Sequence, residues 1–377
     1  MFIKSISARK IFDSRKEPTI EVTINSSTAS SPSGKSKGKY ETPSYHSALQ
    51  WNINAINNLH EIKIIPIISF EDLSLIESLI KDKFKLRDVR QFGANALYAL
   101  ESAILKALAK EQNKQLWQII NPKAKRISIP LGNAIGGGLH SHNSSAPEFQ
   151  EFLIIPQKKT MKENYKLMKK IHKKLRKILH SEKMNDEGAW ETNMTNEQIL
   201  GILKNFKDTK IGLDIASSPF YKNGKYNYKT FSLTKNEQIS YINALIKAYN
   251  LFYVEDPMDE EDFSGFSKIK KSVLITGDDL TTTHIDRLKK AIKNKSINAM
   301  IIKPNQNGSL LELSEIISFC KKRNIKTIFS HRSGETLDTA IADYAFGFQT
   351  DFIKCGIATK YRKGKLKRLI QIEKSLK

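Results

Sequence analysis

Six short apolar segments of this 377-residue chain each end in an ionisable residue. The six residues are Asp214, Glu255, Asp278, Lys303, His331 and Lys354. Successive members lie 23 to 41 residues apart, close to the ~31 residues that one strand–helix unit of an eight-stranded barrel occupies. A charge at the end of one strand only marks where burial stops, but six in succession indicate a shared site.

The residue types in this set predict a divalent metal and a base. Asp214, Glu255 and Asp278 would repel one another at a common site unless a cation lay between them. Carboxylate oxygens suit Mg²⁺, which keeps water positions open for substrate oxygens. Lys303 and Lys354 indicate proton abstraction and anion binding, because a lysine beside a metal and a second cation has a lowered pKa and can act as a base.

Short strands and amphipathic helices alternate over the region that must position these residues. The clearest predicted strands are residues 210–216, 251–256, 273–279, 297–304, 327–331 and 351–356. The predicted helices between them are residues 235–249, 283–293, 310–322 and 335–345. This alternation over about 250 residues predicts a (β/α)₈ barrel, and a doubly wound parallel sheet is the second candidate.

A mixed α+β region precedes the predicted barrel. Its first 24 residues are typical of two strands, and two amphipathic helices follow before residue 110. Residues 25–39 are rich in Ser, Gly and Lys, which indicates a long mobile loop. We therefore expect an N-terminal α+β domain at residues 1–122 and a barrel at residues 123–377.

Composition limits the class of protein. The chain has 62 Lys and Arg against 39 Asp and Glu, a net charge of +23, and its 40% hydrophobic content is typical of a globular protein. Cys320 and Cys355 are too few for a disulfide framework and favour a reducing compartment. No apolar run approaches the ~20 residues of a membrane span, and the N-terminus lacks a signal-peptide pattern. We expect a soluble cytoplasmic protein that does not enter membranes.

The spacing of apolar and basic residues at 164–180 predicts a strongly basic amphipathic helix. Its basic residues are Lys166, Lys169, Lys170, Lys173, Lys174, Arg176 and Lys177. A solvated outer face of a barrel helix explains this pattern, and non-specific binding to nucleic acid or to another anionic surface is the second hypothesis.

Motifs spread over almost the whole chain carry a family resemblance. They are IFDSRKEPTIEV (11–22), PSGKSKG (32–38), GANA (93–96), GGGLH (136–140), QEF (150–152), NDEGAW (185–190), IGLDIASSPFY (211–221), VEDPMDEEDF (254–263), GDDL (277–280), IKPNQNGS (302–309), SHRSGET (330–336) and IKCG (353–356). The chain resembles the enolase (phosphopyruvate hydratase) family. The resemblance implies an N-terminal domain that caps the barrel and a homodimeric assembly. It also implies a lyase that interconverts 2-phosphoglycerate and phosphoenolpyruvate.

The resemblance also implies the residues that bind metal and carry out catalysis. Asp214, Glu255 and Asp278 match the ligands of a high-affinity Mg²⁺, and Ser36 matches a lid residue that helps to bind a second Mg²⁺ with the substrate. Lys303 matches the base that removes the C2 proton. Glu187 matches the acid that protonates the departing C3 hydroxyl, and Glu151 lies beside it. We expect Glu151 to raise the pKa of Glu187, because two neighbouring carboxyl groups do not ionise together easily.

The remaining matches are substrate contacts. Lys354 matches a contact to the substrate carboxylate, and Arg332 and Ser333, next to His331, match contacts to the phosphate. His140 matches a mobile-loop histidine near the leaving group, for which His142 is a rival.

Some positions depart from the family pattern and leave alternatives open. The lid sequence SGKSKG replaces the more usual SGASTG and brings Lys35 and Lys37 beside the expected phosphate position. The chain therefore also fits a divergent enolase-like protein with an altered substrate. A basic binding or scaffold protein on an enolase fold is the third hypothesis, although none of the main catalytic positions is lost.

Overall fold

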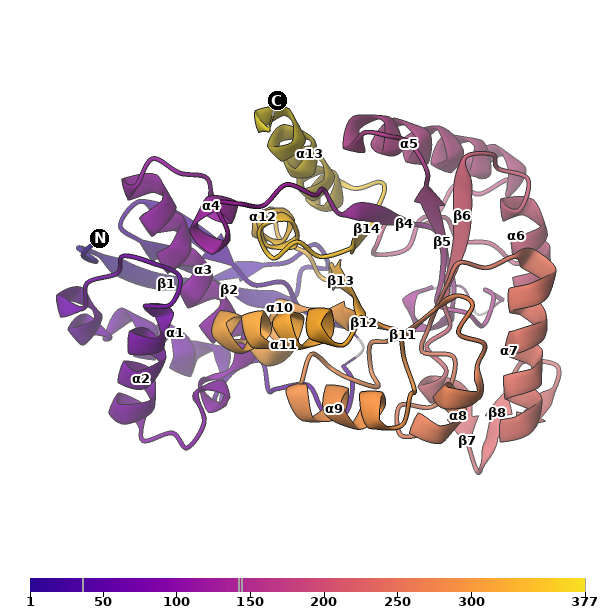
Figure 1. The fold of residues 1–377 in the computed structure, drawn as a ribbon, viewed down its shortest axis with the longest axis horizontal. Helices are drawn as coiled ribbons and strands as arrows, with labels where there is room; N and C mark the ends of the chain where they lie inside the picture. Colours follow the sequence, from indigo (N-terminus) through magenta and orange to yellow (C-terminus); the bar gives the residue numbers. More distant parts are fainter. Residues whose placement is uncertain (36, 142, 144, 377) are drawn as a thin grey trace.

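The computed structural model describes residues 1–35, 37–141, 143 and 145–376, and it consists of a strand–helix part and a closed barrel (Figure 1). The N-terminal strands are β1 (Ile6–Phe12), β2 (Pro18–Ile24) and β3 (Ser27–Ser30), which form one antiparallel sheet. The helices of this part are α1 (Leu49–Asn57), α2 (Leu73–Phe84), α3 (Ala94–Glu111) and α4 (Leu116–Ile120), with 3₁₀ helices η1 (His60–Ile64) and η2 (Val89–Phe92).

The helix α3 joins the N-terminal sheet to the barrel. It is apolar on almost every side and nearly all of its residues are buried, as expected of a helix surrounded by protein. One side packs against β2 and β3, and another packs against the short barrel helix α10 (Pro304–Asn307). The N-terminal part is therefore held firmly against one end of the barrel.

The prediction of a single loop at residues 25–39 is wrong in its first part. Ser27–Ser30 form β3, which pairs with β2 from Ile24↔Ser27 to Glu21↔Ser30. Asn25 has a φ of 53°, the left-handed conformation that a two-residue hairpin turn requires. A Ser-rich composition hid this hairpin, and the irregular segment begins only after Ser30.

The predicted barrel is confirmed, and its closure rules out the doubly wound sheet. In order around the barrel its strands are β10 (Tyr253–Glu255), β11 (Leu274–Gly277), β12 (Ala299–Ile302), β13 (Lys326–Ser330), β14 (Phe352–Gly356), β4 (Ile129–Gly136), β5 (Glu151–Pro156) and β6 (Thr209–Asp214). Neighbouring strands are parallel except at β5, which runs antiparallel to both β4 and β6. The first residue of β5 therefore lies at the same end of the barrel as the last residues of the other strands.

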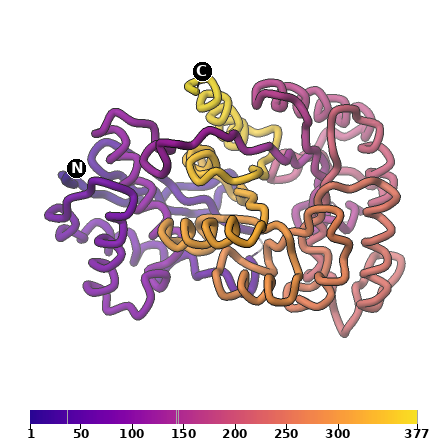
Figure 2. Tube along the Cα trace, in the orientation of Figure 1, coloured from indigo at the N-terminus to yellow at the C-terminus, as the bar shows by residue number. Residues whose placement is uncertain are grey.

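Helices surround the barrel (Figures 1 and 2). They are α5 (Met161–Ile178), α6 (Asn196–Leu203), α7 (Lys235–Tyr249), α8 (Phe263–Lys268), α9 (Ile285–Lys293), α11 (Leu310–Lys322), α12 (Ala340–Gly347) and α13 (Lys360–Ser375). The smaller elements are η3 (Gly138–His140), η4 (Ser218–Phe220) and the sheet of β7 (Tyr221–Lys222), β8 (Lys225–Asn227) and β9 (Ser232–Thr234). Capping boxes begin α5, α6 and α7, where a threonine side chain accepts from the backbone three residues later.

The helix predicted at residues 335–345 begins five residues later, at Ala340. The preceding segment is held by the N-terminal part instead. The N–H of Glu335 donates to Ser14 Oγ at 3.0 Å, and Gly334 pairs with Ser33 through backbone hydrogen bonds of 2.7 and 2.9 Å. These contacts satisfy the backbone without a helix and keep the segment at the barrel mouth.

Apolar side chains fill the interior of the barrel away from that mouth. A buried cluster there consists of Leu131, Leu153, Ile155, Tyr253, Ala299, Ile301, Ile328 and Phe352. Branched and aromatic side chains of this kind make a packed core rather than a pore. The charged residues that line the cavity lie at the opposite end, beside the carboxyl ends of the parallel strands. No helix in the described part of the chain is both long and apolar enough to cross a membrane.

Candidate active site

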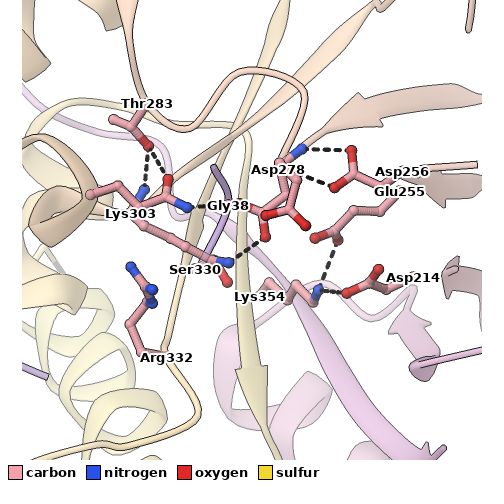
Figure 3. Close-up of polar contacts among 12 residues, drawn as sticks. Gly38, Asp214, Glu255, Asp256, Asp278, Thr283, Lys303, Ser330, Arg332 and Lys354 are labelled. Atoms are coloured by element: carbon pink, nitrogen blue, oxygen red, sulfur yellow. Dashed lines mark hydrogen bonds and ion pairs between the residues drawn. The ribbon is translucent and has the colours of Figure 1, made fainter. Parts of the chain in front are cut away.

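The strand-end residues that the sequence singles out meet at one end of the barrel (Figure 3). Asp214 ends β6, Glu255 ends β10 and Lys354 lies in β14, while Asp278, Lys303 and His331 directly follow β11, β12 and β13. All of these except Glu255 line one cavity, together with His140, Glu151, Glu187, Arg332 and Ser333. Glu255 contacts this cavity indirectly, because it accepts a hydrogen bond from Lys354. The fold therefore brings together residues that lie up to 320 residues apart, from Gly34 to Lys354.

Lys354 is surrounded by carboxylates. Its Nζ lies 2.8 Å from Asp214 Oδ2, 2.8 Å from Glu255 Oε2 and 3.3 Å from Glu151 Oε2. Burial lowers the pKa of Lys354, but these three carboxylates outweigh burial and raise it well above its usual value. Lys354 therefore stays a fixed positive charge at the floor of the site.

The carboxylates around Lys354 still carry more negative charge than it neutralises. Burial, followed by the neighbouring charge of Asp214, raises the pKa of Glu255 to about 8 despite the ammonium of Lys354. Glu255 Oε1 is buried and has no hydrogen-bond partner among the described residues. A buried carboxylate oxygen without a donor is costly and indicates room for a further cation.

Lys303 forms an ion pair with Asp278 (Figure 3). Burial lowers the pKa of Lys303, but the charge of Asp278 outweighs burial and the pKa is raised. The lowered pKa expected from the sequence requires a metal beside Lys303, and it stays a prediction.

Asp256 holds the turn that carries Asp278. Its two carboxylate oxygens accept the backbone N–H groups of Asp278 at 3.0 Å and Asp279 at 2.8 Å. Asp278 and Asp279 thereby turn toward the mouth, and all three carboxylates lie close enough to bind one ion. Asp256 is not among the residues predicted for the site, and its position next to Glu255 is the signal in the sequence that could have found it.

A second group of acids faces the cavity from β5 and from the loop before α6. His140 Nδ1 lies 3.6 Å from Glu187 Oε1 and 3.9 Å from Glu151 Oε1, and Asn133 Nδ2 donates to Glu187 Oε2 at 2.8 Å. Glu151 could not be found by its place at a strand end, because it begins β5. The reversed direction of β5 brings it to the mouth.

The two acids differ in their affinity for a proton. Burial and the charge of Glu187 raise the pKa of Glu151 well above its usual value. Burial also raises the pKa of Glu187, but the charges of His331, His140 and Arg362 outweigh burial. Together with a hydrogen bond from Glu151, they hold this pKa well below its usual value. This direction differs from the expectation that Glu187 has the raised pKa. The two groups are coupled as expected, and the charges around them favour the proton on Glu151.

Arg362 fixes His331 from behind. This fully buried arginine of α13 donates from Nε to His331 Nδ1 at 3.1 Å and from Nη2 to the carbonyls of Arg332 and Ser333, both at 3.0 Å. A guanidinium has no acceptor, so Nδ1 accepts and the ring proton lies on Nε2, which faces Glu187 Oε2 at 3.7 Å. Arg362 lies in none of the family motifs. The basic segment around it was the one signal in the sequence, and that signal does not predict a contact with His331.

The segment after β3 lies over the mouth of the cavity. Gly34 lines the cavity beside Arg332, and the N–H of Lys35 donates to Ser333 Oγ at 2.6 Å. Arg332 Nη2 donates to both oxygens of Glu41 at 3.0 and 2.9 Å. Lys37 Nζ donates instead to Ser44 Oγ at 3.0 Å and is exposed. The expected metal ligand Ser36 and the candidate His142 lie outside the described residues.

The residues present fit a divalent metal. Carboxylates outnumber cations around the cavity, and Glu255 Oε1 lacks a donor among the described residues. Among the described residues, two groups are close enough to hold an ion, His140 with Glu151 and Glu187, and Asp256 with Asp278 and Asp279. Of the three expected carboxylate ligands, only Asp278 belongs to such a group, and Asp214 and Glu255 both accept from Lys354. Oxygen donors of this kind suit a hard cation.

Comparison with known proteins identifies the family. The family model for the enolase N-terminal domain matches residues 3–120, and the model for the enolase C-terminal TIM barrel domain matches residues 124–377. The chain belongs to the enolase family. It is therefore an enzyme of the lyase class, and the resemblance seen in its motifs is confirmed.

Relatives named enolase match over nearly their whole length. The chain is 37% identical to that of Methanocorpusculum labreanum, with 98% of each chain covered. It is 36% identical to that of Ehrlichia ruminantium, over 99% of this chain and 96% of the relative, and 34% identical to that of Picrophilus torridus, over 99% of both. We propose residues 1–122 and 123–377 as the capping and catalytic domains, a division that the two family matches support.

Proposed function

We propose that this enolase-family enzyme catalyses the reversible dehydration of 2-phosphoglycerate to phosphoenolpyruvate with Mg²⁺. The observation that carries the proposal is the shared cavity of Lys303, the Glu151–Glu187 pair and Arg332. A base, a proton-holding acid pair and a guanidinium match the three needs of the reaction. These are removal of the C2 proton, loss of the C3 hydroxyl and binding of the phosphate.

Lys303 is the proposed base. Its amine accepts the C2 proton, and it must first be neutral to do so. A divalent cation held by Asp214, Glu255 and Asp278 would supply positive charge beside the substrate carboxylate and would take over the carboxylate that now pairs with Lys303. Lys354, which is fixed by three carboxylates, contributes a permanent positive charge on the same side of the cavity.

The Glu151–Glu187 pair is the proposed general acid. Hydroxide leaves poorly, and a positioned acid contributes about 10²–10⁴-fold. The raised pKa of Glu151 favours a proton on the pair. The hydrogen bond between the two carboxyl groups gives that proton a path to Glu187, which the family pattern places at the leaving hydroxyl. His140, within 3.9 Å of both acids, and the Nε2–H of His331 orient the pair.

Arg332 and Ser333 are the proposed phosphate contacts. The guanidinium of Arg332 is now paired with Glu41, so a phosphate must replace that carboxylate. The cavity measures about 20 Å³, which accommodates roughly one water molecule. We therefore propose that residues 32–35 and 37–41 move away to admit substrate and close over it afterwards.

Three further properties belong to the same proposal. They are a second Mg²⁺ bound with the substrate and aided by Ser36, a homodimeric assembly, and a cytoplasmic location. The support for these three properties is that the chain belongs to the enolase family. The orientation of Lys37 toward Ser44 does not favour an altered substrate.

The test is the appearance of the enol absorbance of phosphoenolpyruvate from 2-phosphoglycerate, with Mg²⁺ and with excess chelator. We expect turnover with Mg²⁺ and its loss on chelation. Turnover that survives complete chelation would contradict the metal requirement. A folded, Mg²⁺-loaded protein without turnover would contradict the substrate assignment, and other 2-phosphorylated hydroxy acids would then be assayed.

A further inference from the structure

Two neighbouring outer helices, α5 and α13, present an almost purely basic surface. On α5, every fully exposed position except Glu163 and Ile178 is Lys or Arg. On α13, the exposed positions are Lys360, Lys363, Lys367, Gln371, Lys374 and Ser375. The helices lie side by side in Figures 1 and 2, and the N–H of Met161 donates to Glu373 Oε1 at 2.8 Å. We call the exposed lysines of α5 and α13 the lysine face.

The lysine face is not a product of overall composition. The outer helix α7 has 15 residues against 18 in α5, yet its exposed positions are Asn236, Glu237, Ser240, Ala244, Lys247 and Ala248. A uniform bias toward lysine would have enriched both helices. The basic charge is therefore denser on α5 than on α7, although the shorter helix α9 also exposes Lys289, Lys290 and Lys293.

Carboxylates do not neutralise this face. Within the described part of the chain, no lysine of the face forms an ion pair, and Arg176 pairs with Glu182. Glu163 is used to cap α5 at Thr160, and Glu373 accepts from Met161. Each lysine is consequently available to an external anion, and their mutual repulsion favours a polyanionic partner.

The residue types on the lysine face distinguish between three polyanionic partners: a membrane, single-stranded nucleic acid and double-helical nucleic acid. The apolar residues Met168, Ile171 and Leu175 of α5 are buried against the barrel, so the helix has no apolar side to insert into a membrane. No exposed position of either helix is aromatic, so the face cannot stack the bases of a single strand. Lysines act as point charges, which suits the phosphate backbone of a duplex.

We propose that the lysine face binds double-helical nucleic acid through its phosphates, without regard to sequence and independently of the proposed reaction. Helix α5 has 18 residues and spans about 27 Å. A duplex carries one charge per about 1.7 Å of axis, so an equal length presents about 16 phosphates. The lysines of two adjacent helices can therefore meet several phosphates at once.

The test measures fluorescence anisotropy of a labelled RNA duplex of about 20 base pairs at several salt concentrations. The face variant replaces Lys169, Lys173, Lys174 and Lys363 by glutamine. The control variant replaces Lys222, Lys225, Lys247 and Lys293 by glutamine. These exposed lysines lie on β7, β8, α7 and α9 and form no ion pair in the described structure, so the control makes the same change in net charge. Thermal melting of both variants checks that they are folded.

We expect the face variant to bind about tenfold or more weakly at ~0.1 M salt and to lose about three to four units of the log–log salt slope. The control variant should change affinity by less than about threefold. Equal weakening of both variants would overturn the proposal in favour of net charge alone. It would also be overturned by absence of duplex binding, or by binding to phosphatidylserine vesicles in preference to the duplex.

Discussion

Lys303 directly follows β12, and its ammonium forms an ion pair with Asp278 in the cavity. Replacing it by alanine removes the proposed base but leaves the phosphate contacts intact. We expect Lys303→Ala to slow exchange of the C2 proton with deuterated solvent by about 10³-fold, while substrate affinity changes little. Exchange followed by NMR measures this, and Lys326→Ala, an exposed lysine paired with Asp351, is the control. Exchange at the wild-type rate would exclude Lys303 as base.

Arg362 acts on the site through His331. Burial lowers the pKa of His331 well below its usual value, and the positive charge of Arg362 adds to this effect against the opposing charge of Glu187. We expect ¹⁵N NMR of the histidines to show the ring proton of His331 on Nε2 in the intact protein. Arg362→Met should let the ring titrate nearer its usual pH and should lower turnover by about 10–100-fold, with partial rescue by Arg362→Lys. A proton on Nδ1 in the intact protein would contradict this role.

At the scale of elements, the segment after β3 depends on a glycine. A Cβ at Gly34 would overlap the guanidinium of Arg332, which is buried and held by Glu41. We expect Gly34→Ala to raise the KM for 2-phosphoglycerate about tenfold, equivalent to about 1.4 kcal/mol. The control is Gly201→Ala in α6, where nothing lies within 4 Å of the added carbon. An unchanged KM in Gly34→Ala would show that Arg332 has another position from which it binds phosphate.

The junction of the N-terminal part and α9 is sensitive to acid. Burial, together with Arg90, lowers the pKa of His284 to about 4 from an unshifted value of 6.5, and Arg90 Nη1 lies 3.0 Å from its Nδ1. The unfolded chain therefore takes up this proton first, and the free energy of unfolding falls as the pH is lowered from about 6.5 toward about 4.

We expect this loss to amount to about 1–2 kcal/mol, allowing for partial exposure of the ring to solvent. In His284→Gln the loss over the same pH window should shrink by that amount. Chemical denaturation of both proteins between pH 4 and pH 7 measures it. Identical pH dependence in the two proteins would rule out His284 as the titrating group.

At the scale of the whole molecule, a strongly basic chain encloses an acidic pocket. The net charge is +23, yet Asp214, Glu255, Asp278 and Asp279 crowd one end of the barrel, and burial with the charge of Asp278 raises the pKa of Asp279 to about 8. We expect saturating Mg²⁺ to raise the Tm by about 3–4 °C, because a ligand at 100 times its Kd stabilises by about 2.7 kcal/mol.

This effect should vanish in Asp278→Asn. It should persist in Asp286→Asn, which alters a carboxylate that is 91% exposed on α9. Because the measurement does not involve turnover, it tests metal binding separately from catalysis. An equal rise in Tm for both variants would place the bound ion elsewhere on the surface.

Much of the catalytic half could be predicted because its signals are local. Apolar runs of strand length separated by amphipathic helices depend only on neighbouring residues, and the predicted strands coincide with β6 and β10 to β14. The ends of parallel strands meet at one side of a barrel, so the strand-end residues from Asp214 to Lys354 could be assigned to one site before any contact was known.

The tertiary structure alone decided what depends on partners distant in sequence. The direction of β5, which brings Glu151 to the mouth, follows from pairing with β4 and β6. The opposite directions of the pKa shifts of Glu151 and Glu187 follow from the charges that surround each buried acid. Arg362 reaches His331 only because α13 packs behind the loop after β13. The sequence by itself determined the elements, the family motifs and the residue types at the site. Strand direction, burial and electrostatic environment are properties of groups brought together by folding, and no local pattern encodes them.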